Sequence, residues 1–222
     1  MKFSKLVALA FVSAHGLCAM ASQEAVDQAV WSVAQKAQDL SFKAGTRQGE
    51  LASCELVFSY PYIDNRAYKG APLIVRGSVN SNYFKDKTFN YLLKVTPIRL
   101  LFDVKTREFS YKVLTPAAAS MKINGQTMQS YKIQEFTCED KGFCVAYAGK
   151  PADAGLSLIK TSLDKTPFDA QIFFSANKNG FDESFRLSEL KPEDLKKTNE
   201  QMRHEFSQCL FDLVQKQMDS MK

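Results

Sequence analysis

Cysteine is the residue type in this chain most able to form covalent links. Four cysteines follow a predicted signal segment, namely Cys54, Cys138, Cys144 and Cys209. An even number of cysteines in an exported chain favours disulfides. Cys138 and Cys144 flank a short polar stretch with a glycine that can bring two strand ends together, so we predict that they pair. Cys54 and Cys209 are then left for each other. Closing that long loop stabilises the fold by about 3–5 kcal/mol in the chain-entropy model.

The other residues capable of chemistry do not form a catalytic pattern. His204 is the one histidine beyond the signal segment, which excludes a zinc site built on a histidine pair. The cysteines are too far apart for a CxxC redox motif, and neither GxSxG nor GxGxxG occurs. Paired acids occur at 139–140, 182–183 and 193–194, where turns and helix starts explain them. We therefore predict no enzyme activity, no catalytic residue, no cofactor and no metal.

Aromatic residues gather in the first half of the chain. Tyr60, Tyr62 and Tyr83 could form an aromatic surface for a sugar or a partner protein. The alternative is that they are core residues on alternating strand faces. We expect that alternative for Phe89 and Tyr91, and the three tyrosines are the candidate partner surface.

Residues 1–21 have the pattern of a secretory signal peptide. Lys2 and Lys5 precede an apolar run over 6–18, and Ala19-Met20-Ala21 predicts cleavage before Ser22. The run is shorter than the roughly 20 residues that a membrane-spanning helix needs. A retained anchor and a lipoprotein start at Cys18 are the alternatives. We expect a periplasmic, outer-membrane-associated or secreted protein.

Removing 21 residues from 222 leaves a mature chain of 201, with 27 basic and 24 acidic side chains. This length can bury a substantial core. A net charge of +3 does not favour nucleic acid as a partner. No second segment is long and apolar enough to span a membrane. The expected partners are other proteins of the envelope or the host, which could include a membrane-associated complex.

The periodicity of apolar residues predicts helices at both ends and strands between them. Apolar residues recur every three or four positions over 23–44, with Gly45 as a stop. Pro192-Glu193-Asp194 has the composition of a first helical turn, and Met202, Phe206, Cys209, Leu210 and Leu213 form one face beyond it. The expected divisions are a signal peptide (1–21), an N-terminal helix (22–50), a β-domain (51–190) and a C-terminal helix on that domain (191–222).

The central region has the short strands and turns of an antiparallel sandwich or barrel. Asn124-Gly125 is the strongest hairpin signal, and Lys105-Thr106-Arg107-Glu108 is a second turn. The strands are expected near 54–60, 73–79, 89–95, 100–104, 109–113, 121–123, 126–128, 131–136, 143–147 and 170–175.

Residues 54–190 resemble the invasion-associated locus B family of bacterial exported proteins in the order of five short motifs. These are Cys54-Glu55-Leu56-Val57, Thr96-Pro97-Ile98-Arg99-Leu100-Leu101, Met121-Lys122-Ile123-Asn124-Gly125, the Cys138 and Cys144 segment with Val145-Ala146, and Asn179-Gly180-Phe181 followed by Leu187 and Leu190. The resemblance implies an immunoglobulin-like β-sandwich, a link to virulence and host-cell invasion, and no catalytic residues.

The family's first strand carries a tryptophan and a cysteine that are not recognisable here, and Trp31 falls in a predicted helix. Cys209 would then replace the missing partner of Cys54. We expect a protein that acts by protein–protein binding, with a structural subunit of an envelope assembly, such as a secretion system, as the alternative. The two helical ends are expected to form one supporting layer.

Overall fold

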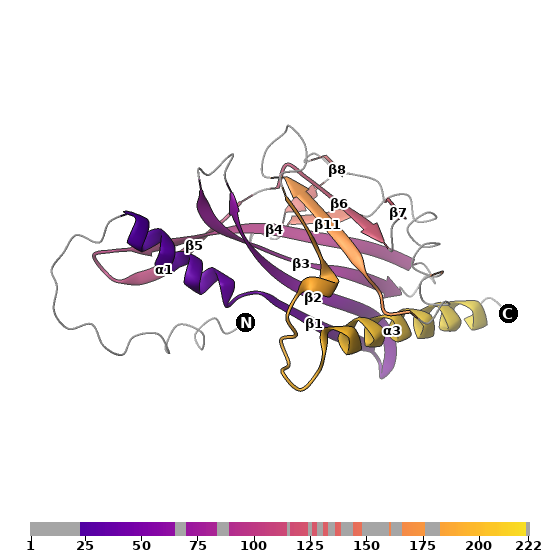
Figure 1. The fold of residues 1–222 in the computed structure, drawn as a ribbon. Coiled ribbons are helices and arrows are strands. Elements are labelled where there is room, and N and C mark those ends of the chain that lie inside the picture. The colour runs from indigo at the N-terminus through magenta and orange to yellow at the C-terminus, as the bar shows by residue number, and fades with distance from the viewer. Residues whose placement is uncertain are drawn as a thin grey trace.

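The computed structural model describes residues 23–64, 70–83, 89–114, 116–123, 126–127, 131–132, 136–138, 144–147, 160, 166–175 and 183–220. Its fold is mainly β, with a curled antiparallel sheet and helices at both ends of the described chain (Figure 1). None of the described helices is long and apolar enough to cross a membrane. The elements are α1 (Gln23–Gln35), β1 (Asp39–Arg47), β2 (Glu50–Asp64), β3 (Ala71–Tyr83), β4 (Phe89–Asp103), β5 (Glu108–Val113), β6 (Ala118–Ile123), β7 (Gln126–Thr127), β8 (Tyr131–Lys132), β9 (Phe136–Cys138), β10 (Cys144–Tyr147), β11 (Ala170–Ser175), β12 (Glu183–Arg186), the 3₁₀ turn η3 (Leu187–Glu189) and α3 (Asn199–Ser220).

The larger sheet has seven strands among the described residues, in the order β1-β2-β3-β4-β10-β9, with β5 also paired to β4. A two-residue turn joins β1 to β2, because Arg47 pairs with Glu50. Gln48 and Gly49 both have positive φ, at 55° and 84°. Positive φ at both central residues is typical of the type I′ turn, whose twist matches that of a hairpin.

Strand β4 holds the sheet together because it has neighbours along both sides. It pairs with β3 over Phe89–Arg99 on one side, and on the other it pairs first with β10 and then with β5. Pro97 lies in the gap between those two neighbours, and its carbonyl accepts a hydrogen bond from the Leu114 N–H at 2.8 Å. The proline nitrogen faces the same side, so the missing N–H breaks no ladder bond.

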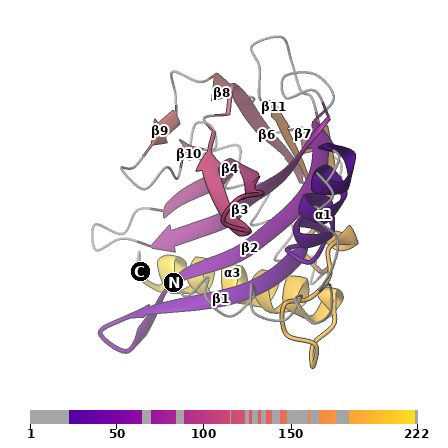
Figure 2. The ribbon, with the colours of Figure 1, turned by 90° about the vertical axis from the view of Figure 1, so that its left-hand side faces the viewer.

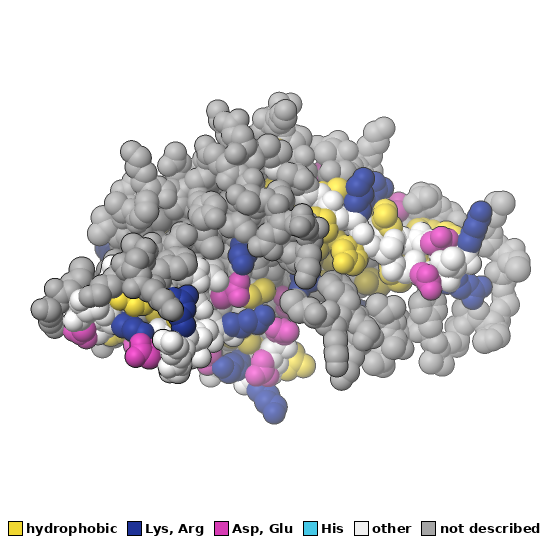
Figure 3. Space-filling view, turned by 180° about the vertical axis from the view of Figure 1, so that it is seen from behind, with side chains coloured by type: hydrophobic (Ala, Val, Ile, Leu, Met, Phe, Trp, Pro, Cys, Tyr) yellow, Lys and Arg dark blue, Asp and Glu magenta, His cyan; other side chains and the backbone are white. Residues whose placement is uncertain are grey.

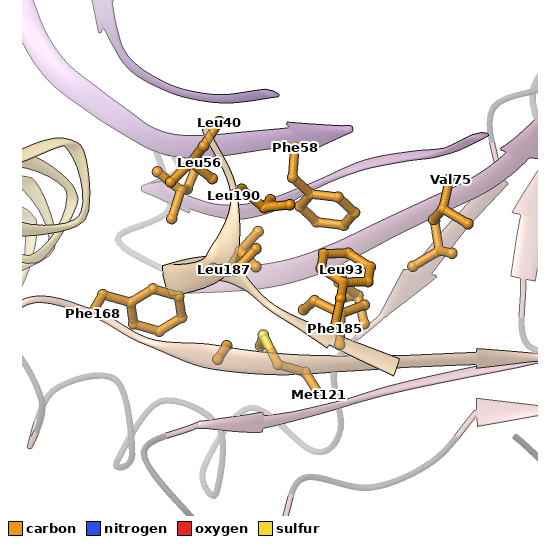
Figure 4. Close-up of a cluster of buried hydrophobic side chains, with 14 of the residues drawn as sticks. Leu40, Leu56, Phe58, Val75, Leu93, Met121, Phe168, Phe185, Leu187 and Leu190 are labelled. Carbon is orange, nitrogen blue, oxygen red and sulfur yellow. The ribbon is translucent and has the colours of Figure 1, made fainter. Parts of the chain in front are cut away.

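The smaller sheet has five described strands, in the order β12-β11-β6-β7 with β8 also on β6. Ile123 of β6 pairs with Gln126 of β7, as the predicted Asn124-Gly125 hairpin requires. The two sheets face one another across one apolar core (Figure 4). Phe185 joins the two sides, because its ring lies 5.3 Å from that of Phe58 and 4.4 Å from that of Tyr60.

Helix α3 closes one end of this core. The Phe206 ring lies 6.4 Å from Phe42 of β1 and 4.9 Å from Phe168, which precedes β11. Cys209 forms a disulfide with Cys54 of β2, which confirms that predicted pair. The apolar face predicted for this helix is buried as well. Helix α3 therefore ties the larger sheet to the start of the smaller one.

The N-terminal helix is shorter than predicted. Helix α1 ends at Gln35, and residues 39–47 form strand β1 in place of the predicted end of the 23–44 helix. Leu40 fits the helical spacing, but its side chain is fully buried in the core from a strand. Gly45 lies within β1 and stops no helix.

The C-terminal helix also begins later than predicted, at Asn199, so Pro192 is not in its first turn. Pro192 instead forms a parallel bridge with Leu40 of β1. The helical ends do not form one layer, because Figure 2 shows α1 in front of the strands and α3 behind them. Helix α1 contacts β2, β3 and β4, whereas α3 contacts β1 and β2.

Candidate functional site

Strand β1 lies at one edge of the larger sheet. Within the described residues, β1 has a strand neighbour on its β2 side only. Leu40 is satisfied on the outer side, because its N–H donates to the Lys191 carbonyl at 2.7 Å and its carbonyl accepts from the Glu193 N–H at 2.8 Å. Backbone groups alternate along a strand, so those of Phe42 and Ala44 also face outward. The outward N–H and C=O groups of Phe42 and Ala44, which follow the bonds made by Leu40, can therefore pair with another extended chain.

A groove of about 350 Å³ lies against this edge. It is bounded by β1, by the segment before α3 and by the first turns of α3. Its lining residues are Ser41, Phe42, Lys43, Glu193, Asp194, Lys197, Met202 and Glu205. Met202 is buried at the base, and Phe42 packs against the core. The groove therefore has an apolar base and a charged rim.

The charges on the rim are of both signs. The Lys197 ammonium contacts both carboxylate oxygens of Glu205 at 2.7 Å, which fixes one side of the groove. Lys43 stands on β1, and Glu193 and Asp194 stand on the segment opposite. Basic and acidic side chains are likewise interspersed on the described part of the molecule's rear face (Figure 3). A mixed rim suits a polar peptide better than a polyanion.

One carboxyl group beside the groove is electrostatically unusual. The pKa of Asp39 is raised from 3.8 to about 6, chiefly by burial and to a smaller extent by the charge of Glu193, while Arg76 and Lys43 partly oppose the shift. Asp39 begins β1, and the strand register aligns it with Ser59, Arg76 and Thr96. This group changes charge close to neutral pH. The described residues contain no group of three His, Cys, Asp or Glu side chains that could hold a metal.

The three tyrosines of the predicted partner surface are buried or partly buried. Tyr62 is only 5% exposed, and its ring lies 5.0 Å from Phe174 in the core. Tyr60 stacks on Phe185, and its burial raises its pKa. The Tyr83 hydroxyl donates to Ser220 Oγ of α3 at 3.2 Å. Tyr62 belongs to the core and Tyr60 and Tyr83 pack against it, which favours the core alternative.

The remaining predicted residues do not line the groove. Cys138 of β9 and Cys144 of β10 are direct partners in the strand register, which agrees with their predicted pairing, but their disulfide stays a prediction. His204 is exposed on α3. Phe89 and Tyr91 lie on β4, and their side chains lie outside the described part.

The sequence contains a signal for the groove that the helical interpretation concealed. Asp39-Leu40-Ser41-Phe42-Lys43 alternates polar with apolar residues, which is the strand period of two. Gln48-Gly49 then supplies a glycine turn before the next strand. Nothing in the sequence brings residues 193–197 to this edge, because they follow it by about 150 positions.

Comparison with protein-family models, curated proteins and solved structures finds no match to this chain. Membership of the invasion-associated locus B family therefore stays a prediction.

Proposed function

We propose that this chain is a non-enzymatic exported protein of the bacterial envelope that binds another protein. The open edge of β1 would accept an extended segment of that partner as an added strand. The observation that carries this proposal is the outward bonding of Leu40, from which strand alternation turns the backbone of Phe42 and Ala44 outward too, at an edge where Phe42 helps to line a groove. Main-chain hydrogen bonds would supply affinity, and the groove would select among side chains.

The chemistry of the groove describes the segment it would receive. The incoming strand would place one apolar side chain over Phe42 and Met202. Its neighbours would meet Lys43 on one side and the acids Glu193 and Asp194 on the other. A segment with a central apolar residue and charges of both signs beside it would satisfy this arrangement.

The surrounding structure suits a rigid receptor. The disulfide and the Phe206 contacts hold α3 against β1 and β2. The Lys216 ammonium also donates to Glu50 at 2.6 Å and to the Leu51 carbonyl at 3.1 Å, which holds the β1–β2 hairpin. A preorganised edge loses little conformational entropy on binding.

Export and an immunoglobulin-like arrangement of the sheets belong to the same proposal. The signal pattern over 1–21 supports export, and the Cys54–Cys209 disulfide suits an oxidising compartment. The immunoglobulin-like form and a part in host-cell invasion are supported by the five sequence motifs alone.

A proline substitution tests the edge directly. Ala44→Pro removes an outward N–H without removing a bond to β2, and prolines are tolerated on edge strands in that orientation. Ala44→Val keeps the N–H and is the matched control. Envelope extracts passed over the parent and both variants should yield proteins that the parent and the valine variant retain and the proline variant loses. Identical captures from all three would refute strand addition at β1.

The same extracts address the alternative function. Size-exclusion of the native protein after cross-linking would show whether it resides in one stable, large complex. Such a complex would favour the structural subunit of an envelope assembly. A protein that elutes alone and binds reversibly would favour the binding protein.

A further inference from the structure

The β4–β5 hairpin projects beyond the larger sheet as a two-stranded ribbon. The pairing of β4 with β3 ends at Arg99, whereas its pairing with β5 continues to Asp103. Figure 1 shows this hairpin reaching past β3 at the end of the molecule away from α3. Asp103 orders the turn, since its carboxylate accepts from the N–H groups of Lys105 at 2.8 Å and Thr106 at 3.3 Å. We name residues 99–112 the ribbon.

Most of the apolar side chains of the ribbon share one face. Leu100 pairs with Tyr111 and Phe102 with Phe109, and side chains of paired residues share a face of the sheet. The Phe102 and Phe109 rings lie 4.8 Å apart. Tyr111 is 58% exposed, and Val104 in the turn is 54% exposed. Exposed apolar groups gathered on a projecting element are typical of an interaction surface.

The ribbon is also basic. It carries Arg99, Lys105, Arg107 and Lys112 against the two acids Asp103 and Glu108. Lys105, Arg107 and Lys112 are exposed, and none of them forms an ion pair with another residue that the structure describes. Because no described residue neutralises these three charges, they can meet an anionic surface.

We propose that the ribbon docks this protein on an anionic lipid bilayer. Aromatic rings and short apolar side chains enter the interfacial layer, while lysine and arginine reach the headgroup phosphates. Exposed apolar side chains lie on both faces of the tip, with Leu101 on one face, Tyr111 on the other and Val104 at the turn. The tip can therefore enter a fluid interfacial layer with either face toward the lipid. A narrow tip with apolar groups on both sides suits a fluid layer better than a single protein pocket.

This inference stands independently of the groove. The ribbon and α3 lie at opposite ends of the molecule, so docking through the ribbon leaves α3 away from the membrane (Figure 1). The membrane attachment would be peripheral, because the described helices include none that could span a bilayer. A protein held on the bilayer in this way could still bind a partner at β1.

Vesicle sedimentation tests the electrostatic part. The probes are phosphatidylcholine vesicles with and without about 30% phosphatidylglycerol. Every variant is expressed as the full chain and purified in the form that the cell accumulates. Any contribution of the N-terminus to vesicle binding is then the same in all of them. The parent should bind the anionic vesicles, and salt should release it. Lys105→Glu with Lys112→Glu should weaken binding by about tenfold or more. Lys191→Glu with Lys196→Glu makes the same net change on exposed residues near α3 and should leave binding unchanged.

An apolar pair of variants tests insertion. Val104→Asp should weaken binding to the anionic vesicles. Leu195→Asp should not, because Leu195 is 91% exposed on the segment before α3, away from the ribbon. Melting curves confirm that each variant is folded. The proposal is overturned if the parent ignores anionic vesicles, or if the ribbon variants bind like their controls. It is equally overturned if the ribbon variants lose an envelope protein but keep the vesicles, because the ribbon is then a protein interface.

Discussion

The Phe58 ring fills the space that a side chain at Gly77 would occupy. The two residues are direct partners across β2 and β3. A Cβ on residue 77 would lie 2.6 Å from Phe58 Cζ and would also meet the carbonyl oxygen of Lys94. The glycine is therefore required for close approach of ring and backbone, and this contact lies in the core between the two sheets.

Replacing Gly77 with alanine should destabilise the fold by about 1–3 kcal/mol, because the added methyl overpacks the core. Urea unfolding measures the loss. Phe58→Leu should relieve part of it, since the shorter side chain leaves room while the Lys94 carbonyl stays in place. Gly49→Ala is the control, because its cost comes from a φ of +84° and its surroundings are open. The costs of Phe58→Leu and Gly49→Ala should simply add.

Breaking the Cys54–Cys209 disulfide should lower stability by about 3–5 kcal/mol, because the two cysteines are 155 positions apart and the bond restricts the unfolded chain. Paired substitution of both cysteines by serine tests this in urea without a reducing agent. A midpoint equal to the parent's would show that α3 is held by packing alone. Peptide mapping without reduction should also find Cys138 joined to Cys144.

Leu210→Asp with Leu213→Asp should destabilise the isolated protein strongly. Both leucines are buried on the inner face of α3, at 2% and 0% exposure, and each contributes roughly 2–5 kcal/mol to the stability of the fold. Met218→Asp on the same helix is the control, because Met218 is 50% exposed and its change should stay within about 0.5 kcal/mol. Thermal melting distinguishes them. A double variant that melts like the parent would contradict the burial of this face.

Asp39 should make stability fall as pH rises. Its pKa is about 6 in the fold and 3.8 ordinarily, so the folded protein holds this proton more tightly than the unfolded chain. The stability it contributes is present in full below pH 3.8 and is lost as pH rises through about 6. Asp39→Asn should therefore gain stability relative to the parent between about pH 4 and pH 7.

Melting temperatures across that pH range provide the measurement for Asp39. Asp194→Asn removes an exposed carboxylate from the facing segment and should follow the parent's pH dependence. A constant difference between parent and Asp39→Asn at all pH values would contradict the raised pKa.

Most strands from residue 51 onward could be predicted, because apolar and polar residues alternate where one face of a strand is buried more deeply than the other. Strand β12 (Glu183–Arg186) was not predicted. The predicted turns at Asn124-Gly125 and after Asp103 were correct for a different reason, because local backbone preference decides a hairpin. Strand β1 was missed because Leu40 also continues the apolar spacing of α1. Its strand form depends on pairing with β2 and on the bridge to Pro192, which are contacts between distant segments.

The candidate site could be predicted far less well than the fold. Its residues come from β1, from the segment after η3 and from α3, and only folding brings them together. The burial of the tyrosines could not be predicted, because an alternating aromatic pattern does not reveal what covers each face. Tyr60 and Tyr62 face the smaller sheet, whose Phe185 and Phe174 cover them.

The separation of Cys54 from Cys209 also sets an order of events during synthesis. In an exported chain Cys138 and Cys144 cross the membrane before Cys209, so in the oxidising compartment Cys54 meets both of them before its native partner. An oxidase acting in order of appearance would join Cys54 to the wrong thiol. Reaching the native bond then requires exchange through a mixed disulfide, a reaction that takes seconds to hours without a catalyst. Correct maturation of this protein should accordingly depend on a disulfide isomerase as well as on an oxidant.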